Sequence, residues 1–68
     1  MTERTLKQKV YDNLENALEN GYDFTNWKSD NVADDMLTYA DYDFPGVEPE
    51  EIKPLIEEWQ NTRRIYND

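Results

Sequence analysis

The stretch that decides the fold is residues 29–41, which read SDNVADDMLTYAD. Its apolar residues recur at the spacing of an α-helix and form a single stripe, so we expect a helix over residues 30–41. Ser29 is suited to cap the start of this helix, because its hydroxyl can accept a hydrogen bond from a free amide of the first turn. The stripe consists of Val32, Ala33, Met36, Leu37 and Ala40.

A second apolar stripe precedes this stretch and predicts a helix over residues 5–20. Its members are Leu6, Val10, Leu14, Ala17 and Leu18, with Tyr11 beside them. Asn20 and Gly21 follow as a stop signal, because glycine readily adopts the left-handed conformation that ends many helices.

A third helix is expected over residues 53–66. Its core side would carry Ile52, Leu55, Ile56, Trp59, Arg63 and Tyr66. Pro54 leaves two alternatives open, because proline removes one helical hydrogen bond and crowds the preceding turn. Either a short turn at 49–53 precedes a helix that begins at Lys53 or Pro54, or a longer helix is kinked there.

Three amphipathic helices with short connections predict an all-α fold, in which residues 1–68 form a single small domain with a compact three-helix arrangement. An aromatic-rich loop at 22–28 and a Pro-Gly turn at 45–46 would connect the helices. We expect four large aromatic side chains in the core, two of them from the loop: Phe24, Trp27, Phe44 and Trp59.

The composition excludes several classes of function. The chain contains no cysteine and no histidine, so it lacks the residues of the usual catalytic triads, thiol chemistry and zinc sites. We therefore expect no enzyme activity and no cofactor. The N-terminal residues are polar and no apolar run approaches the length of a membrane span, so we expect no secretory signal and a cytoplasmic protein.

The negative charge is concentrated in the middle of the chain. The formal net charge is −9, and residues 21–51 contribute −8 of it, with nine acids against Lys28 alone. Six of the nine aromatic residues lie in the same segment. An acidic chain of this kind should avoid direct contact with nucleic acid and anionic membranes and favour basic protein surfaces or cations.

The sequence of this segment does not match the EF-hand pattern of a calcium site. Asp41, Asp43 and Gly46 match its first, third and sixth positions. Pro45 offers no side-chain oxygen at the fifth position, and Ile52 stands where a bidentate glutamate is required. We therefore assign no metal site and expect only weak, unspecific cation binding by the clustered acids.

The acids instead predict a partner-binding surface, here called the acidic surface. Carboxylates one helical turn apart, roughly 5.4 Å, can imitate a phosphate backbone and occupy a site built for nucleic acid. The alternative is that these acids form only a solvated face. The acidic surface comprises Asp30, Asp34, Asp35, Asp41, Tyr42, Asp43, Glu48, Glu50 and Glu51, with Tyr42 as an aromatic anchor.

In its shortness and in the Asp-rich segment 30–43, the chain resembles small acidic proteins of phages and other mobile elements. Some of those proteins mimic nucleic acid and inhibit restriction or CRISPR enzymes. The resemblance implies an inhibitor that binds a basic, nucleic-acid-binding protein in the host cytoplasm. The alternative function is a small interaction module that forms a homodimer through exposed aromatic residues. Binding of the first kind should weaken with salt, whereas apolar self-association should persist.

Overall fold

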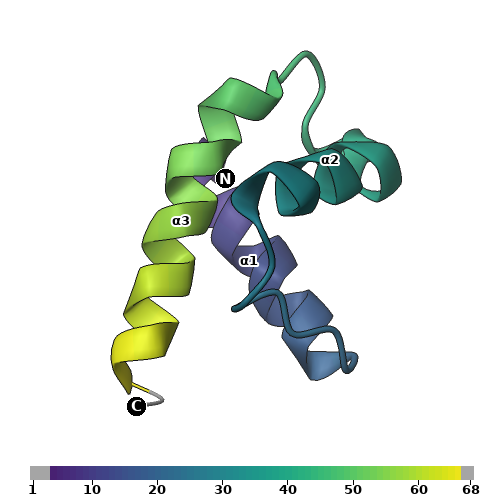
Figure 1. Cartoon of the computed structure of the whole chain (residues 1–68). Helices are drawn as coiled ribbons and strands as arrows, with labels where there is room; N and C mark the ends of the chain where they lie inside the picture. The colour runs from purple at the N-terminus through teal and green to yellow at the C-terminus, as the bar shows by residue number, and fades with distance from the viewer. Residues whose placement is uncertain (1–3, 67–68) are drawn as a thin grey trace.

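The computed structural model describes residues 4–66, with side chains for residues 4–63. Within this range the chain forms three α-helices and one short 3-10 helix (Figure 1). The elements are α1 (Leu6–Glu19), α2 (Ser29–Tyr39), the 3-10 helix η1 (Asp41–Asp43) and α3 (Pro49–Tyr66). The described part of the chain contains no strand. The predicted all-α, three-helix fold is confirmed. None of the helices in the described part is both long and apolar enough to cross a membrane.

Both ends of α1 follow from local sequence. The Thr5 hydroxyl accepts a hydrogen bond from the Gln8 amide at 3.1 Å and caps the first turn. Gly21 has a φ of +93°, and the amides of Gly21 and Tyr22 donate to the carbonyls of Leu18 and Ala17. These bonds satisfy carbonyls that the end of a helix would otherwise leave unpaired, so the predicted stop at Gly21 is confirmed.

The start of α2 differs from the prediction. Lys28 occupies the capping position without a side-chain hydrogen bond, and Ser29 is the first helical residue. The Ser29 hydroxyl donates instead to Oε2 of Glu57 in α3 at 2.7 Å. The predicted capping role of Ser29 is therefore wrong, because this side chain links α2 to α3.

The third helix begins at Pro49, so the expected start at residue 53 is wrong, and of the two alternatives at Pro54 the longer helix that contains this proline is the one observed. Proline suits the first helical position because its ring fixes a helical φ and it has no amide to leave unpaired. Glu51 Oε2 also accepts a hydrogen bond from the Glu48 amide at 2.8 Å, which caps the first turn. Together these features start the helix before Pro54, which lies inside it.

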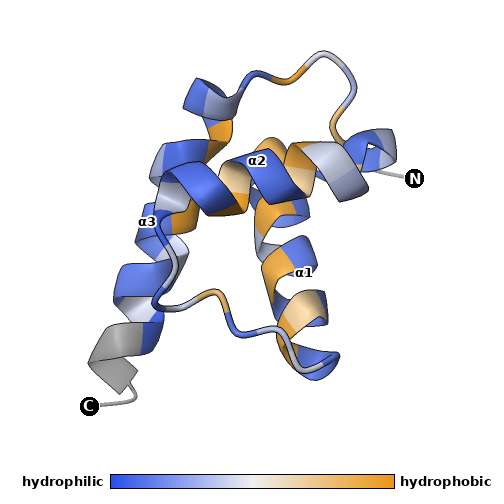
Figure 2. Ribbon diagram, turned by 45° about the vertical axis from the view of Figure 1, so that its right-hand side comes forward, coloured by the Kyte–Doolittle hydropathy of each residue, from blue (hydrophilic) through white to orange (hydrophobic). Residues whose placement is uncertain are grey.

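The long helix α3 is the centre of the packing. Both α1 and α2 pack closely against α3 rather than against each other. Figure 2 shows the hydrophobic residues gathered on the sides of the helices that face the interior. The radius of gyration of 11.5 Å is near the ~11 Å expected for a compact chain of this length. The buried core consists of Val10, Leu14, Phe24, Val32, Ala33, Met36, Ala40, Phe44, Ile52, Ile56 and Trp59.

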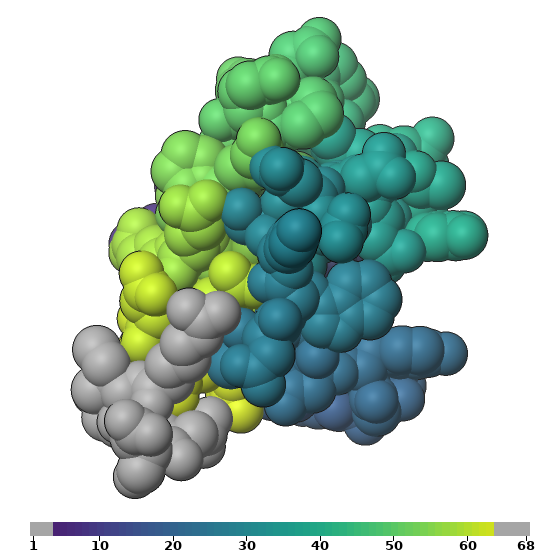
Figure 3. All heavy atoms as spheres, viewed as in Figure 1, coloured from purple at the N-terminus to yellow at the C-terminus, as the bar shows by residue number. Residues whose placement is uncertain are grey.

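The loop between α1 and α2 is fixed by a buried glutamine. Gln60 Nε2 donates to the carbonyls of Phe24 and Trp27 at 2.7 and 2.8 Å, and only 4% of Gln60 is exposed. Phe24 is buried as predicted, but the prediction that Trp27 lies in the core is wrong, since 48% of Trp27 is exposed. The Trp27 ring packs edge-on against Phe24, with ring centroids 4.9 Å apart. In Figure 3 the loop lies between the end of α1 and the C-terminal part of α3.

Candidate protein-binding surface

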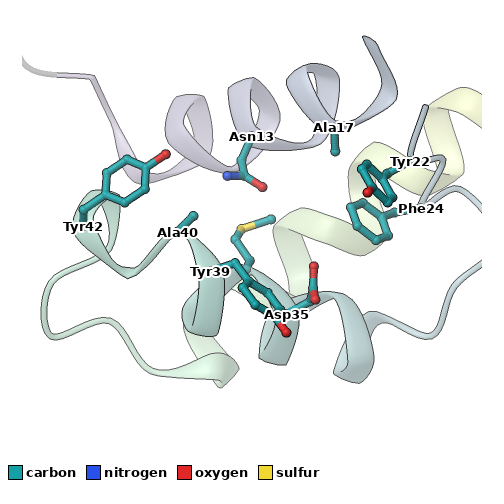
Figure 4. A pocket seen from close by; sticks show the side chains of 9 residues that line it. Asn13, Ala17, Tyr22, Phe24, Asp35, Tyr39, Ala40 and Tyr42 are labelled. Carbon is teal, nitrogen blue, oxygen red and sulfur yellow. The ribbon is translucent and has the colours of Figure 1, made fainter. Parts of the chain in front are cut away.

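A hollow of about 490 Å³, here called the tyrosine groove, lies between α1 and α2 (Figure 4). It forms because both helices pack against α3 and leave space between themselves. Its lining comes from α1, α2, η1 and the aromatic-rich loop. The lining residues are Asn13, Ala17, Tyr22, Phe24, Asp35, Met36, Tyr39, Ala40 and Tyr42.

Three tyrosines form the rim of the groove. Tyr22, Tyr39 and Tyr42 are 65%, 78% and 81% exposed. In Figure 4, Tyr22 and Tyr42 lie toward opposite ends of the groove, and Tyr39 lies between them on the α2 side. Exposed aromatic side chains that share one hollow are typical of surfaces that bind a partner, because tyrosine contributes large contact area at little cost in side-chain entropy.

The floor of the groove is apolar. Met36 from α2, Ala40 directly after α2 and Phe24 from the loop are buried. Ala17 of α1 is half-buried and completes the opposite wall together with Asn13. The side chains of Ala17 and Ala40 are small, so they fill little of the space between the two helices. The arrangement can take an apolar group at its floor and a polar or charged group at its rim.

Asp35 is the single charged residue among the lining residues. It is half-buried and lies one helical turn before Tyr39, so both side chains project from the same side of α2. Asp34 lies next to it but faces outward and is exposed. The groove therefore carries a negative charge that no basic lining residue offsets.

Two acids of the predicted acidic surface are paired within the molecule. Asp30 accepts from Lys53 at 2.5 Å on the α3 side of α2, and this hydrogen bond raises the pKa of Lys53. Asp43 accepts two hydrogen bonds from Arg4, at 2.9 and 3.1 Å. A hydrogen bond to Asp12 and the charge of Asp43 raise the pKa of Arg4. Asp30 and Asp43 are therefore partly neutralised.

The other predicted site residues are distributed over two regions. Asp35 of α2 and Tyr42 of η1 line the groove, and Asp34 and Asp41 are their neighbours in the chain. The remaining members, Glu48, Glu50 and the capping Glu51, lie at the start of α3. Within residues 4–63, six of these acids form no ion pair: Asp34, Asp35, Asp41, Glu48, Glu50 and Glu51.

The sequence prediction missed part of the groove. Tyr22 and Asn13 were not among the predicted site residues, and Tyr39, a second candidate for an aromatic anchor beside Tyr42, was not assigned to the acidic surface although it lies off the apolar stripe of α2. Its position off that stripe was the available signal. Tyr22 follows the glycine that ends α1, and only the packing of the loop places it at the groove.

The described residues contain no group of three or more acidic side chains placed to hold a metal ion. Asp43, at the third position of the EF-hand-like stretch, is hydrogen-bonded to Arg4. The groove offers aromatic faces, one carboxylate and an apolar floor.

Comparisons with protein-family models, with curated proteins and with solved structures found no match for this chain.

Proposed function

We propose that this protein is a non-enzymatic protein-binding protein whose acidic surface engages a basic, nucleic-acid-binding partner and blocks it. The observation that carries the proposal is that Asp35 lines the groove with three exposed tyrosines, with Asp34 and Asp41 next to lining residues in the chain, and that none of the three acids forms an ion pair within residues 4–63. Charge of one sign beside aromatic anchors is what a positively charged partner surface complements.

The carboxylates would act mainly by attraction at a distance. A strongly negative surface accelerates encounter with a positive one and disfavours partners of its own sign. Asp30 lies one helical turn before Asp34 but is paired with Lys53, so Asp34, Asp35 and Asp41 would carry the charge that resembles a nucleic-acid backbone. An inhibitor of this kind, encoded by a phage or another mobile element, would act in the cytoplasm of the host cell.

The test is affinity capture with the wild-type protein, followed by measurement of binding to the captured basic partner at several salt concentrations. The double variant Asp34→Lys/Asp35→Lys should abolish binding, and nucleic acid should compete with the wild-type protein. Glu19→Lys is the control for the single variant Asp34→Lys. Both change the net charge equally, but Glu19 lies in the last turn of α1 and is not a member of the acidic surface. Binding that survives the double variant, or that nucleic acid leaves unchanged, would contradict the proposal.

A second candidate function is self-association through aromatic residues. The exposure of Trp27 and of the three groove tyrosines favours it. Two copies that each carry a net charge of −9 would repel each other, so such a dimer should strengthen when salt is added. Sedimentation at low and high salt separates the two functions, because partner binding through the acidic surface should weaken with salt.

A further inference from the structure

We propose that the tyrosine groove binds an arginine side chain of the partner, with the guanidinium stacked on Tyr39 and paired with Asp35. This inference rests on the proposed function, because it assumes a basic partner. It goes further by naming the chemical group that is recognised and the place where it is held. Attraction between the acidic surface and a basic partner does not by itself require any side chain of the partner to enter the groove.

The floor of the groove suits the stem of an arginine. Met36, Ala40 and Ala17 present apolar surface below the rim. The methylene groups of arginine bury well against such surface while the charged end stays near water. The volume of about 490 Å³ is within the range of roughly 300–1,000 Å³ found for sites that hold small molecules, so it accommodates a long side chain.

The rim suits the guanidinium. Tyr39 offers an exposed aromatic face, and Asp35 offers a half-buried carboxylate from the same side of α2. Charges at a partly buried position are screened less by salt than fully exposed ones. Arginine is favoured over lysine, because its planar group stacks on aromatic rings and pairs with a carboxylate through two parallel hydrogen bonds.

The molecule already holds one of its own cations in this way. Lys7 Nζ lies 5.5 Å from the centre of the Tyr11 ring and 2.9 Å from Oε1 of Glu58. A tyrosine face and a carboxylate thus bind one cation between α1 and α3. Asp35 and Tyr39 present the same pair of groups, but no cation is among the residues that line the groove.

The charge of the groove also argues against two other occupants. A second copy of this chain would bring a net charge of −9 to a groove of the same sign. A nucleic-acid base could stack on the tyrosines, but its phosphates would be repelled by Asp35 and by the neighbouring Asp34 and Asp41.

The experiment uses the Met36 methyl group as a reporter, because it lies in the groove and the chain has only one other methionine. The full chain, with ¹³C-labelled methionine methyls, is titrated at low salt with blocked peptides of alternating glycine and arginine. Matched peptides carry lysine or uncharged citrulline in place of arginine. We expect a saturable shift of the Met36 resonance with arginine, several-fold weaker binding with lysine, and none with citrulline.

A pair of neighbouring variants localises the binding. Asp35→Asn and Asp34→Asn remove the same charge from adjacent positions, but only Asp35 lines the groove. We expect Asp35→Asn to weaken arginine-peptide binding about fivefold or more, and Asp34→Asn less than about twofold. Tyr39→Ser should also weaken binding several-fold, whereas Thr38→Ser on the exposed face should not.

Three outcomes would overturn the groove proposal. Peptide binding that leaves the Met36 resonance unmoved and falls equally in both Asn variants would retain the acidic surface but exclude the groove. No binding of the arginine peptide at low salt, while a captured basic protein still binds, would exclude arginine as the recognised group. A Met36 resonance that moves with protein concentration alone would assign the groove to a second copy of the chain.

Discussion

Gln60 donates a hydrogen bond of 2.7 Å from Nε2 to the carbonyl oxygen of Phe24, and this contact joins the last helix to the loop that precedes α2. The same nitrogen donates to the carbonyl of Trp27 at 2.8 Å. One buried amide thereby donates to two carbonyls of the loop, of which the Phe24 carbonyl also accepts from the Trp27 amide at 3.2 Å. The position of Phe24, and with it one end of the tyrosine groove, depends on this side chain.

Replacing Gln60 by alanine should therefore destabilise the fold strongly. The substitution removes the Gln60 donor from the Trp27 carbonyl and leaves the Phe24 carbonyl with only the Trp27 amide, so we expect a loss of about 1–3 kcal/mol in the free energy of unfolding. Urea denaturation followed by circular dichroism measures this loss. Asn61→Ala is the matched control, because Asn61 is exposed on the same helix and should change stability by less than about 0.5 kcal/mol. Equal effects of the two variants would contradict the structural role of Gln60.

Replacing Pro54 by alanine should stabilise the protein. Pro54 lies inside α3, where it removes the amide that would donate to the carbonyl of Glu50. Alanine restores that bond and is the better helix former, so we expect a gain of about 1–3 kcal/mol. Pro49→Ala is the control, since proline is favourable at the first helical position and its replacement should bring no gain. Thermal unfolding of both variants would show whether position in the helix decides the effect.

The loop should also contribute a dependence of stability on pH. Hydrogen bonds from the Thr25 hydroxyl, and next from its amide, hold the pKa of the Asp23 carboxyl below its ordinary value. A carboxyl whose pKa is lower in the folded state than in the unfolded state stabilises the fold. This contribution is fully present at pH values above the unfolded pKa, which is about 4. That contribution is lost as the pH falls through the lower, folded pKa.

Asp23→Asn tests this linkage, because asparagine keeps an acceptor oxygen but does not titrate in this range. The difference in the free energy of unfolding between wild type and variant should be largest near neutral pH and shrink toward about pH 2. Chemical denaturation at a series of pH values measures it. A difference that stays constant across the series would show that the charge of Asp23 contributes nothing.

Salt should raise the melting temperature of the protein. The net charge of −8 in residues 21–51 is repulsive, whereas the ion pairs of the described residues are exposed and individually worth about 0–1 kcal/mol. Screening therefore removes more repulsion than attraction between about 20 mM and 500 mM sodium chloride. The variant Asp34→Asn/Asp41→Asn should melt higher at low salt and respond less to added salt. A melting temperature that falls with salt would mean that the ion pairs outweigh the repulsion.

The helices could be predicted from the sequence because each is encoded by local features. The apolar spacing around Val10 and Met36 and the glycine at position 21 act within a few residues. The early start of α3 was also a local matter, since Pro49 and Glu51 together stabilise a first turn before Pro54. The start predicted at residue 53 was wrong because the cost of an internal proline was given more weight than the capping of that turn, whereas the alternative of a longer helix through Pro54 agrees with the structure.

Features that depend on packing between distant segments could not be predicted. Trp27 was expected in the core because it is large and apolar, but Gln60 fixes its carbonyl and leaves much of its ring in solvent. The acids of α2 looked equivalent in sequence, yet Lys53 pairs with Asp30, while Asp35 lies at the groove. These assignments arise from how the helices face one another, which periodicity does not specify.

The central place of α3 has a consequence for the order in which the protein folds during its synthesis. The side chains that bury both earlier helices, Ile52, Ile56 and Trp59, are made after α1 and α2. Until they leave the ribosome, the apolar stripes of α1 and α2 have no helix to pack against, and short isolated helices are marginal in water. Folding should therefore be a late, nearly all-or-none event, and a nascent chain that stops before residue 52 should remain exposed to proteases.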